Sequence, residues 1–169
     1  MMSLRTFALG LDDWLVRIET GLIIILVSCL TAVTFAQVVS RYLLGDPLIW
    51  SEESARYLFV WVSMIGSALA IRKGSHFGLD FLIRRMPKFR PIVAPMVIIV
   101  MIAFLVVVLK TGIDETRLAS MQFAMTFPMR MHWAYLALPV GSGLMLVHLL
   151  INLVRSPTAH VLNVSSGSE

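Results

Sequence analysis

Long runs of apolar residues, separated by short polar stretches, dominate the hydropathy pattern of this chain. A helix needs roughly 20 mostly apolar residues to cross the hydrocarbon core of a bilayer. Four runs in this chain meet this requirement. The second run is the weakest candidate for a span, because its outer turn contains Arg56 and Tyr57. The runs are continuous rather than alternating, so they predict helices and not a β-barrel. The predicted spans cover about 18–44, 54–71, 92–109 and 133–154.

Two further segments, at about 4–17 and 77–86, have apolar residues at helical spacing and charged residues on the other faces. Such helices can lie flat in the headgroup region, but the first can equally be a cytoplasmic extension of the first span. Residues 156–169 are rich in small polar types, which predicts a disordered cytoplasmic tail. We therefore expect one all-α integral membrane domain over residues 1–155, with four transmembrane helices and short amphipathic interfacial helices.

Composition agrees with a membrane location. Of the 169 residues, 58% are hydrophobic and only 14% are charged, whereas about a quarter are charged in a soluble domain. The net charge of +4 comes from basic residues beside the apolar runs, so we interpret them as orientation signals and not as a nucleic-acid surface. Cys29 is the single cysteine, which excludes an intrachain disulfide and a cysteine metal site.

The distribution of Lys and Arg predicts that both termini face the cytoplasm. The first apolar run is longer than a signal-peptide core and follows acidic residues, so we expect it to remain as a span. Nine basic residues share the side of the termini: Arg5, Arg17, Arg72, Lys73, Arg84, Arg85, Lys88, Arg90 and Arg155. Five lie on the other side: Arg41, Arg56, Lys110, Arg117 and Arg130.

The middle of every predicted span lacks Asp, Glu, Lys and Arg. A carrier that couples transport to ions usually has a charged group at mid-depth, so this pattern argues against a transporter that acts alone. We interpret Gln37 and Asn152 as residues that form hydrogen bonds between helices. His148 has no acidic residue near it in the sequence, so we interpret it as a packing residue rather than a proton relay.

Small residues recur at helical spacing within the spans, and such residues let two helix backbones approach closely. This pattern indicates an interface with another membrane subunit, packing inside the four-helix bundle, or both, because the two are compatible and the sequence does not assign the helix faces. The positions are Ser28, Ala32, Ala36 and Ser40 in the first span, Ser63, Ser67 and Ala70 in the second, and Ala137 and Gly141 in the fourth.

The densest polar group lies at the start of the second span and contains Trp50, Ser51, Glu52, Glu53 and Arg56. Glu52 and Glu53 precede Arg56 by four and three residues, which predicts an ion pair on one helix face. Asp46 or Ser51 is expected to cap this helix. Paired carboxylates can also perform acid–base catalysis or bind a cation, but no nucleophile, ligand histidine or glycine loop accompanies them at useful spacing. We therefore expect a structural anchor, no enzyme activity, no metal and no cofactor.

The segment from Arg41 to Asp80 resembles the small permease (Q-type) subunits of tripartite ATP-independent periplasmic (TRAP) transporters. The matching positions are Arg41, Trp50, Glu52, Glu53, Arg56, Trp61, Gly66, Arg72, Gly74 and His76. A second resemblance lies in the fourth span, at Pro128, Trp133, Tyr135, Pro139 and Gly141. The resemblance implies a scaffold for a large multispan subunit, which moves an organic acid such as sialic acid or a dicarboxylate with sodium. It also implies a periplasmic substrate-binding protein as a third partner.

Within this resemblance, Arg117 and Arg130 are expected on the outer side, where they either contact the binding protein or remain solvated beside lipid headgroups. His76 is expected to orient a turn, and Pro139 to remove a backbone hydrogen bond and bend its span. Two other functions stay open from the sequence. One is a small carrier that acts as a homodimer, and the other is a membrane enzyme or assembly factor with its site at Glu52 and Glu53.

Overall fold

The computed structural model describes residues 2–73, 90–126 and 128–155. Four stretches in this part of the chain are long and apolar enough to cross a membrane: Gly10–Leu44, Ile49–Arg72, Pro95–Ala119 and His132–Leu153. The prediction of an all-helical protein with four membrane spans is therefore confirmed. His76, Gly74, the predicted amphipathic segment 77–86 and the predicted tail lie outside the described residues. The helices are α1 (Met2–Val39), the π-helical η1 (Ser40–Leu44), α2 (Ile49–Arg72), α4 (Arg90–Ala119), α5 (His132–Tyr135) and α6 (Ala137–Arg155).

The predicted amphipathic segment at 4–17 is not a separate helix, because α1 runs without a break through its 38 residues. The alternative of a helical extension of the first span is therefore correct. At 1.5 Å per residue α1 is about 57 Å long, well beyond the roughly 30 Å of a bilayer core. Its N-terminal part therefore extends past the apolar layer.

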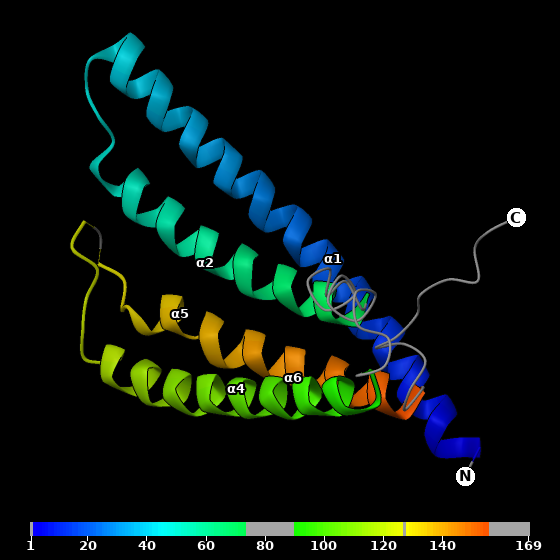
Figure 1. Cartoon of the computed structure of the whole chain (residues 1–169). Coiled ribbons are helices and arrows are strands. Elements are labelled where there is room, and N and C mark those ends of the chain that lie inside the picture. The colour runs from blue at the N-terminus through cyan, green and yellow to red at the C-terminus, as the bar shows by residue number, and fades with distance from the viewer. Residues whose placement is uncertain (1, 74–89, 127, 156–169) are drawn as a thin grey trace, which may run out of the picture.

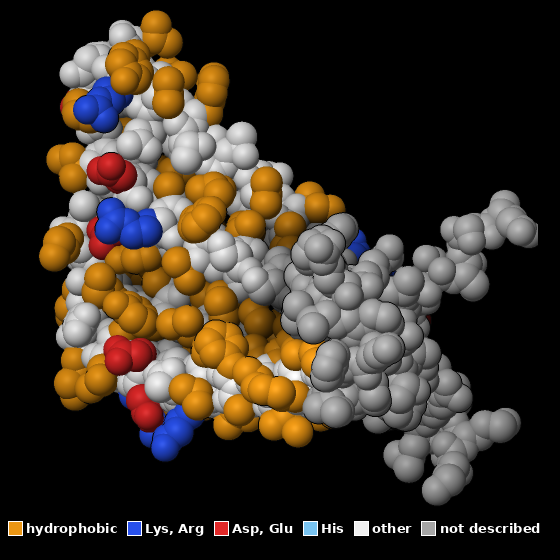
Figure 2. Space-filling model, viewed as in Figure 1, with side chains coloured by type: hydrophobic (Ala, Val, Ile, Leu, Met, Phe, Trp, Pro, Cys, Tyr) orange, Lys and Arg blue, Asp and Glu red, His pale blue; other side chains and the backbone are white. Residues whose placement is uncertain are grey.

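The helices run up and down, so their ends gather at two opposite ends of the bundle (Figure 1). We call the end that holds the start of α1, Arg72, Arg90 and Arg155 the terminus end. The opposite end, which holds η1 and the connection between α4 and α5, is the loop end. Orange apolar side chains cover the middle of the visible face, and red and blue side chains gather toward the loop end (Figure 2). This distribution fits a protein whose middle section lies in lipid.

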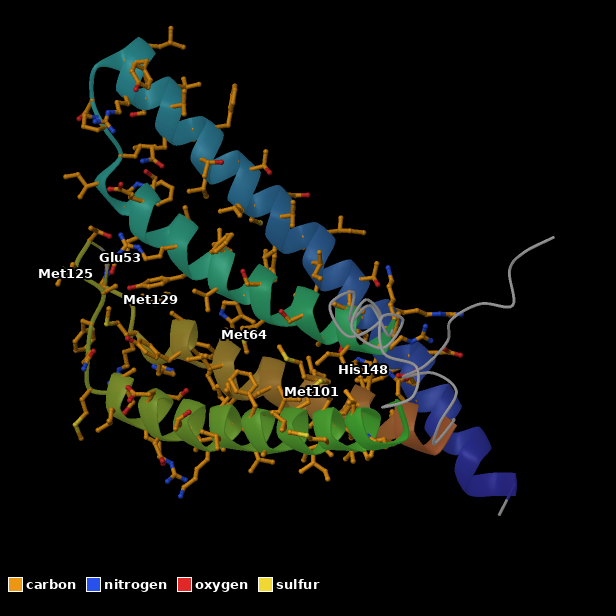
Figure 3. All side chains as sticks on the ribbon, in the orientation of Figure 1. Glu53, Met64, Met101, Met125, Met129 and His148 are labelled. Carbon is orange, nitrogen blue, oxygen red and sulfur yellow. The ribbon has the colours of Figure 1, made fainter. Side chains whose placement is uncertain are left out.

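The core lies between α2, α4 and α6, and α1 stands at the edge of the bundle (Figure 1). In an 18-residue apolar stretch of each span, 44% of the residues are buried in the span that contains α6, whereas 0% are buried in the span of α1. Met64 and Met101 add to the core from α2 and α4 (Figure 3). The buried cluster consists of Ala68, Ile71, Leu105, Met145 and Leu149.

α6 approaches α2 closely at Gly141. A Cβ atom at this position would lie 2.6 Å from the Cβ atom of Met64, which is too short for a real contact. A similar approach joins α4 to α6, where a Cβ atom on Gly112 would lie 3.0 Å from the Cβ of Leu138 and 3.1 Å from Pro139. Glycine thus supplies the space that lets α6 pack against both neighbours, since dispersion contacts replace the hydrophobic drive that lipid does not provide.

Two irregularities interrupt the spans. The π-helical η1 ends at Gly45, whose φ of 70° is in the left-handed region that glycine adopts without strain. The fourth span divides into α5 and α6 at Leu136. Pro139 has no N–H to offer the carbonyl of Tyr135, the residue that ends α5. The backbone hydrogen bond that Pro139 was expected to remove is therefore missing where the fourth span divides into α5 and α6.

Candidate functional site

Glu53, near the start of α2, collects hydrogen bonds from the connection between α4 and α5 (Figure 3). Its carboxylate accepts from the backbone N–H groups of Met125, at 3.2 Å, and Thr126, at 2.9 Å. The Thr126 hydroxyl and the Tyr57 hydroxyl donate to it as well. A carboxylate is a strong acceptor for several donors at once, so Glu53 ties the loop end of α2 to a segment more than 70 residues later.

The predicted ion pair between Arg56 and Glu52 or Glu53 is wrong for the described residues, whose ion pairs all lie at the terminus end. Tyr57 stands four residues after Glu53, on the same helix face, and its hydroxyl occupies one carboxylate oxygen. The donors of Met125 and Thr126 fill the remaining acceptor positions. Arg56 is left exposed.

The predicted cap of α2 is also wrong. The capping position is Leu48, which makes no side-chain cap bond. Ser51 lies inside the first turn, where its hydroxyl donates to the Leu48 carbonyl at 2.6 Å instead of accepting from a backbone N–H. Asp46 lies farther out, and its backbone carbonyl accepts the hydroxyl of Ser40 from η1. Helix α2 therefore begins after the position that an Asp46 cap would require and before the position that a Ser51 cap would require.

The segment that Glu53 anchors is a short hairpin at the loop end, described over residues 122–126 and 128–131. The Ala124 N–H donates to the Met129 carbonyl at 2.8 Å, and the Met131 N–H donates to the Gln122 carbonyl at 3.0 Å. Arg130 lies over the ring of Phe123, with its guanidinium carbon 5.8 Å from the ring centre, in the range of a cation–π contact. Below the hairpin, the Trp61 indole donates to the Trp133 carbonyl at 3.1 Å and joins α2 to α5.

A second polar network lies at the terminus end, and the sequence reasoning missed it. His148 of α6 is fully buried between two carboxylates of α1 (Figure 3). Its Nδ1 lies 2.8 Å from Asp12, and its Nε2 lies 2.9 and 3.1 Å from the two oxygens of Glu19. The expectation that His148 has no acidic neighbour is therefore wrong. These carboxylates are more than 120 residues away in sequence, so local spacing carried no sign of them.

Arg72, the last residue of α2, extends this network. Its Nε lies 3.1 Å from Asp12 and its Nη2 lies 2.9 Å from Asp13. Asn152 of α6 donates to the carbonyl of Ile71 at 3.0 Å and more weakly to that of Arg72 at 3.4 Å. The predicted role of Asn152 in bonding between helices is confirmed. The network therefore links α1, α2 and α6 where the three helices converge.

The small-residue stripe of the first span lies mostly on the outer face of α1. Ser28, Ala32 and Ala36 are exposed, while the half-buried positions Ile23, Leu26, Leu30 and Val33 lie on the side toward α2. Ser63, Ser67 and Ala70 of α2 are exposed as well, whereas Ser40 of η1 and the α6 positions Ala137 and Gly141 are buried. The exposed small residues therefore do not pack inside the four-helix bundle, which was one of the two interpretations of this stripe.

The remaining predicted residues lie apart from one another. Gly66 faces α1, with Ile23 at the limit of contact. Arg41, Glu52, Arg117 and Arg130 are exposed, and Trp50 is 43% exposed, as expected for a residue of the membrane interface. Among the described residues, no group of three or more His, Cys, Asp or Glu side chains is arranged to hold a metal ion.

Comparison with known proteins gives these features a family context. The family described as "Tripartite ATP-independent periplasmic transporters, DctQ component" matches residues 30–158. The sialic acid TRAP transporter small permease protein SiaQ of Vibrio cholerae is 30% identical over 155 residues, which cover 90% of this chain and 88% of the relative. The C4-dicarboxylate TRAP transporter small permease protein DctQ of the same species is 31% identical over 93 residues, 54% of this chain and 40% of the relative.

A longer relative matches only in part. The sialic acid TRAP transporter permease protein SiaT of Haemophilus influenzae is 36% identical over 115 residues. These residues are 68% of this chain but only 19% of the relative, so the matched region is a small part of that permease. The family match, the near full-length agreement with SiaQ and the four apolar helices lead to one conclusion: this chain belongs to the DctQ family of TRAP transporter small permease components.

Proposed function

We propose that this chain supports the large subunit of a TRAP transporter for an organic acid, and that its own residues do not bind the transported substrate. The observation that carries this proposal is the exposed apolar surface of α1. Ile24, Ile25, Phe35 and Val38 are 61, 60, 70 and 54% exposed, although they lie in a membrane span. An apolar helix with small residues on its outer face suits close packing against another membrane helix.

The relatives support the same partner. In SiaT and in the isethionate permease protein DctMQ of Oleidesulfovibrio alaskensis, the region similar to this chain accounts for 19% and 17% of the protein. The rest of each permease lies beyond that region, within the same polypeptide. We infer that this chain associates with a separate large permease subunit, that sodium coupling and the substrate site belong to that subunit, and that the substrate is a carboxylate. No catalytic activity is proposed.

The proposed orientation puts both termini in the cytoplasm and the loop end in the periplasm of a bacterial inner membrane, because nine basic residues lie on the side of the termini and five on the other. Arg117 and Arg130 then face the periplasm, where they are candidates for contact with acidic groups of a substrate-binding protein. The hairpin that carries Arg130 is held by Glu53, so little ordering is needed when a partner binds.

Co-expression of this chain with a large TRAP permease subunit tests the main proposal. The wild-type chain should co-purify with that subunit in detergent. Replacing Ala36 on the exposed stripe of α1 by Trp should reduce the recovered amount, whereas Val107→Trp, at a 60% exposed position of α4, serves as the matched control. Purification of the chain only with copies of itself would instead support a homodimeric carrier and reject the proposal.

Reversal of charge tests the second contact. With Arg117→Glu and Arg130→Glu together, the affinity for the binding protein should fall, and the loss should shrink at high salt because exposed charges are screened. Lys110→Glu, an exposed change on α4, is the control. Unchanged docking and uptake in the double variant would show that the two arginines are only solvated or headgroup charges.

A further inference from the structure

The buried histidine at the terminus end occupies an unusual position for a membrane helix. His148 is 0% exposed, and its two partners Asp12 and Glu19 are 0% and 3% exposed. Asp12 and Glu19 are seven residues apart, so they lie two turns from each other on the same face of α1. The imidazole of α6 fits between them, with one ring nitrogen directed at each carboxylate. We call these three residues the histidine bridge.

The arrangement determines how many protons the histidine bridge holds. Ionised carboxylate oxygens only accept hydrogen bonds, and neutral imidazole has a single N–H. Both ring nitrogens of His148 lie within 3.1 Å of a carboxylate oxygen, so a neutral ring between two ionised carboxylates would leave a lone pair of one ring nitrogen facing a lone pair of a carboxylate oxygen. Two hydrogen bonds form if the ring is the imidazolium. The second oxygen of Asp12 accepts a hydrogen bond from the guanidinium of Arg72.

The charges of the network then nearly balance. Asp12, Asp13 and Glu19 contribute three negative charges, and His148 and Arg72 contribute two positive charges. Without the proton on His148, the imidazole would add no positive charge beside the buried carboxylates of Asp12 and Glu19, whereas Asp13 is exposed and pairs with Arg72. Buried charges of one sign are unfavourable unless a partner compensates them.

The position of the histidine bridge allows it to restrict the movement of α1 relative to α6. α1 lies near α6 only toward the terminus end and diverges from it toward the loop end (Figure 1), and His148 sits where the two approach (Figure 3). Among the described residues, the hydrogen bonds that join α1 to α6 all come from the histidine bridge. Two attachments, two turns apart on α1, restrict both the tilt and the rotation of that helix.

We propose that Asp12, Glu19 and the imidazolium of His148 are positioning residues that set the angle at which α1 leaves the bundle. This inference rests on the proposed function, because the angle decides where the exposed face of α1 meets the large subunit. The three side chains touch neither substrate nor ion. They act through the placement of α1.

The protonation state can be measured directly on the full-length chain in nanodiscs with ¹⁵N-labelled histidine. The chain has four histidines, so the signals that disappear in His148→Gln identify the ring of interest. At neutral pH, both nitrogens of His148 should have the shifts of protonated imidazolium, with attached protons moved downfield by their carboxylate partners. A spectrum with one protonated and one bare nitrogen would overturn the proposal.

The angle can be measured with two spin labels, one on each helix, after Cys29→Ser removes the native thiol. Phe35→Cys on α1 and Val140→Cys on α6 are suitable because both side chains are exposed. Glu19→Gln and His148→Gln should shift and broaden the distance distribution between the labels, while His132→Gln, a histidine outside the histidine bridge, should not. Glu19→Gln retains an acceptor oxygen and is the milder change, so it remains informative if His148→Gln fails to fold.

An unchanged distance distribution in both variants, with helix content intact, would overturn the positioning role. Recovery of the large subunit is measured separately with the wild-type chain. Failure of the wild-type chain to co-purify contradicts the proposed function, whereas unaltered distances contradict the histidine bridge alone.

Discussion

Glu53 accepts two hydrogen bonds from Thr126, one from its backbone N–H at 2.9 Å and one from its hydroxyl. The two residues are 73 positions apart, and their contact joins the start of α2 to the hairpin at the loop end. The single carboxylate of Glu53 thus holds the connection between α4 and α5 in a fixed place.

Glu53→Ala should loosen the hairpin, because the N–H groups of Met125 and Thr126 lose their acceptor. Hydrogen exchange at these two amides should become faster, while exchange in the middle of α2 should stay slow. Glu52→Ala removes an exposed neighbouring carboxylate and should have little effect. Equal exchange in both variants would show that Glu53 does not anchor the hairpin.

Gly141→Ala should destabilise the bundle, because the added Cβ would lie 2.6 Å from the Cβ atom of Met64. Overpacking of this kind costs about 1–3 kcal/mol. Gly143→Ala is the matched control, since a Cβ atom there has no neighbour within 4 Å and alanine stabilises a helix interior by about 0.5–1 kcal/mol. Thermal unfolding in detergent should therefore move in opposite directions. A smaller residue at Met64 should partly restore Gly141→Ala.

Asn152→Leu should weaken the junction between α6 and the end of α2, because the carbonyl of Ile71 loses its side-chain donor. Hydrogen bonds between membrane helices contribute about 0.6 kcal/mol on average, so the expected loss is small but measurable. Unfolding in a detergent titration provides the measurement. Leu150→Asn on an exposed position of the same helix is a control for the presence of an amide in α6. A loss well above about 2 kcal/mol would mean that Asn152 has a further role.

Changes in the histidine bridge should be strongly non-additive. His148→Leu removes the imidazolium from between the buried carboxylates of Asp12 and Glu19, although Asp12 keeps its pair with Arg72, and should cost about 3–5 kcal/mol. Replacement of all three residues by leucine removes the uncompensated charges, so the triple variant should be more stable than His148→Leu alone. Thermal unfolding of the four corresponding proteins, with Asp12→Leu/Glu19→Leu as the fourth, measures the coupling. Simple addition of the single effects would contradict an ionic bridge.

Several features of this protein follow from local patterns in its sequence. Four continuous apolar runs of membrane length predict four helices, because a helix satisfies its own backbone hydrogen bonds in lipid and a β-barrel would need alternating residues. Asn152 was identified as a residue that bonds between helices, since an amide in a mostly apolar span must find a partner. The pattern from Arg41 to His76 indicated the family, and the comparisons confirm it.

Other expectations failed where the decisive partner is distant in sequence. Local spacing predicted that Arg56 pairs with Glu52 or Glu53, but Thr126 and Met125 compete for the Glu53 carboxylate. The sequence also gave no sign that His148 lies between Asp12 and Glu19, because these residues belong to the first and last spans. Spacing rules describe one helix at a time and do not report which helix lies opposite.

The sequence by itself determined three properties of this protein: its membrane location, the number of its spans and its family. These depend on hydropathy and on motif spacing, which are properties of contiguous residues. Only the tertiary structure decided which polar groups meet and which face of α1 stays exposed. Helices of similar apolar composition can pack in many ways in lipid, and the choice depends on close contacts such as Gly141 with Met64 and on buried charges such as His148 with Glu19.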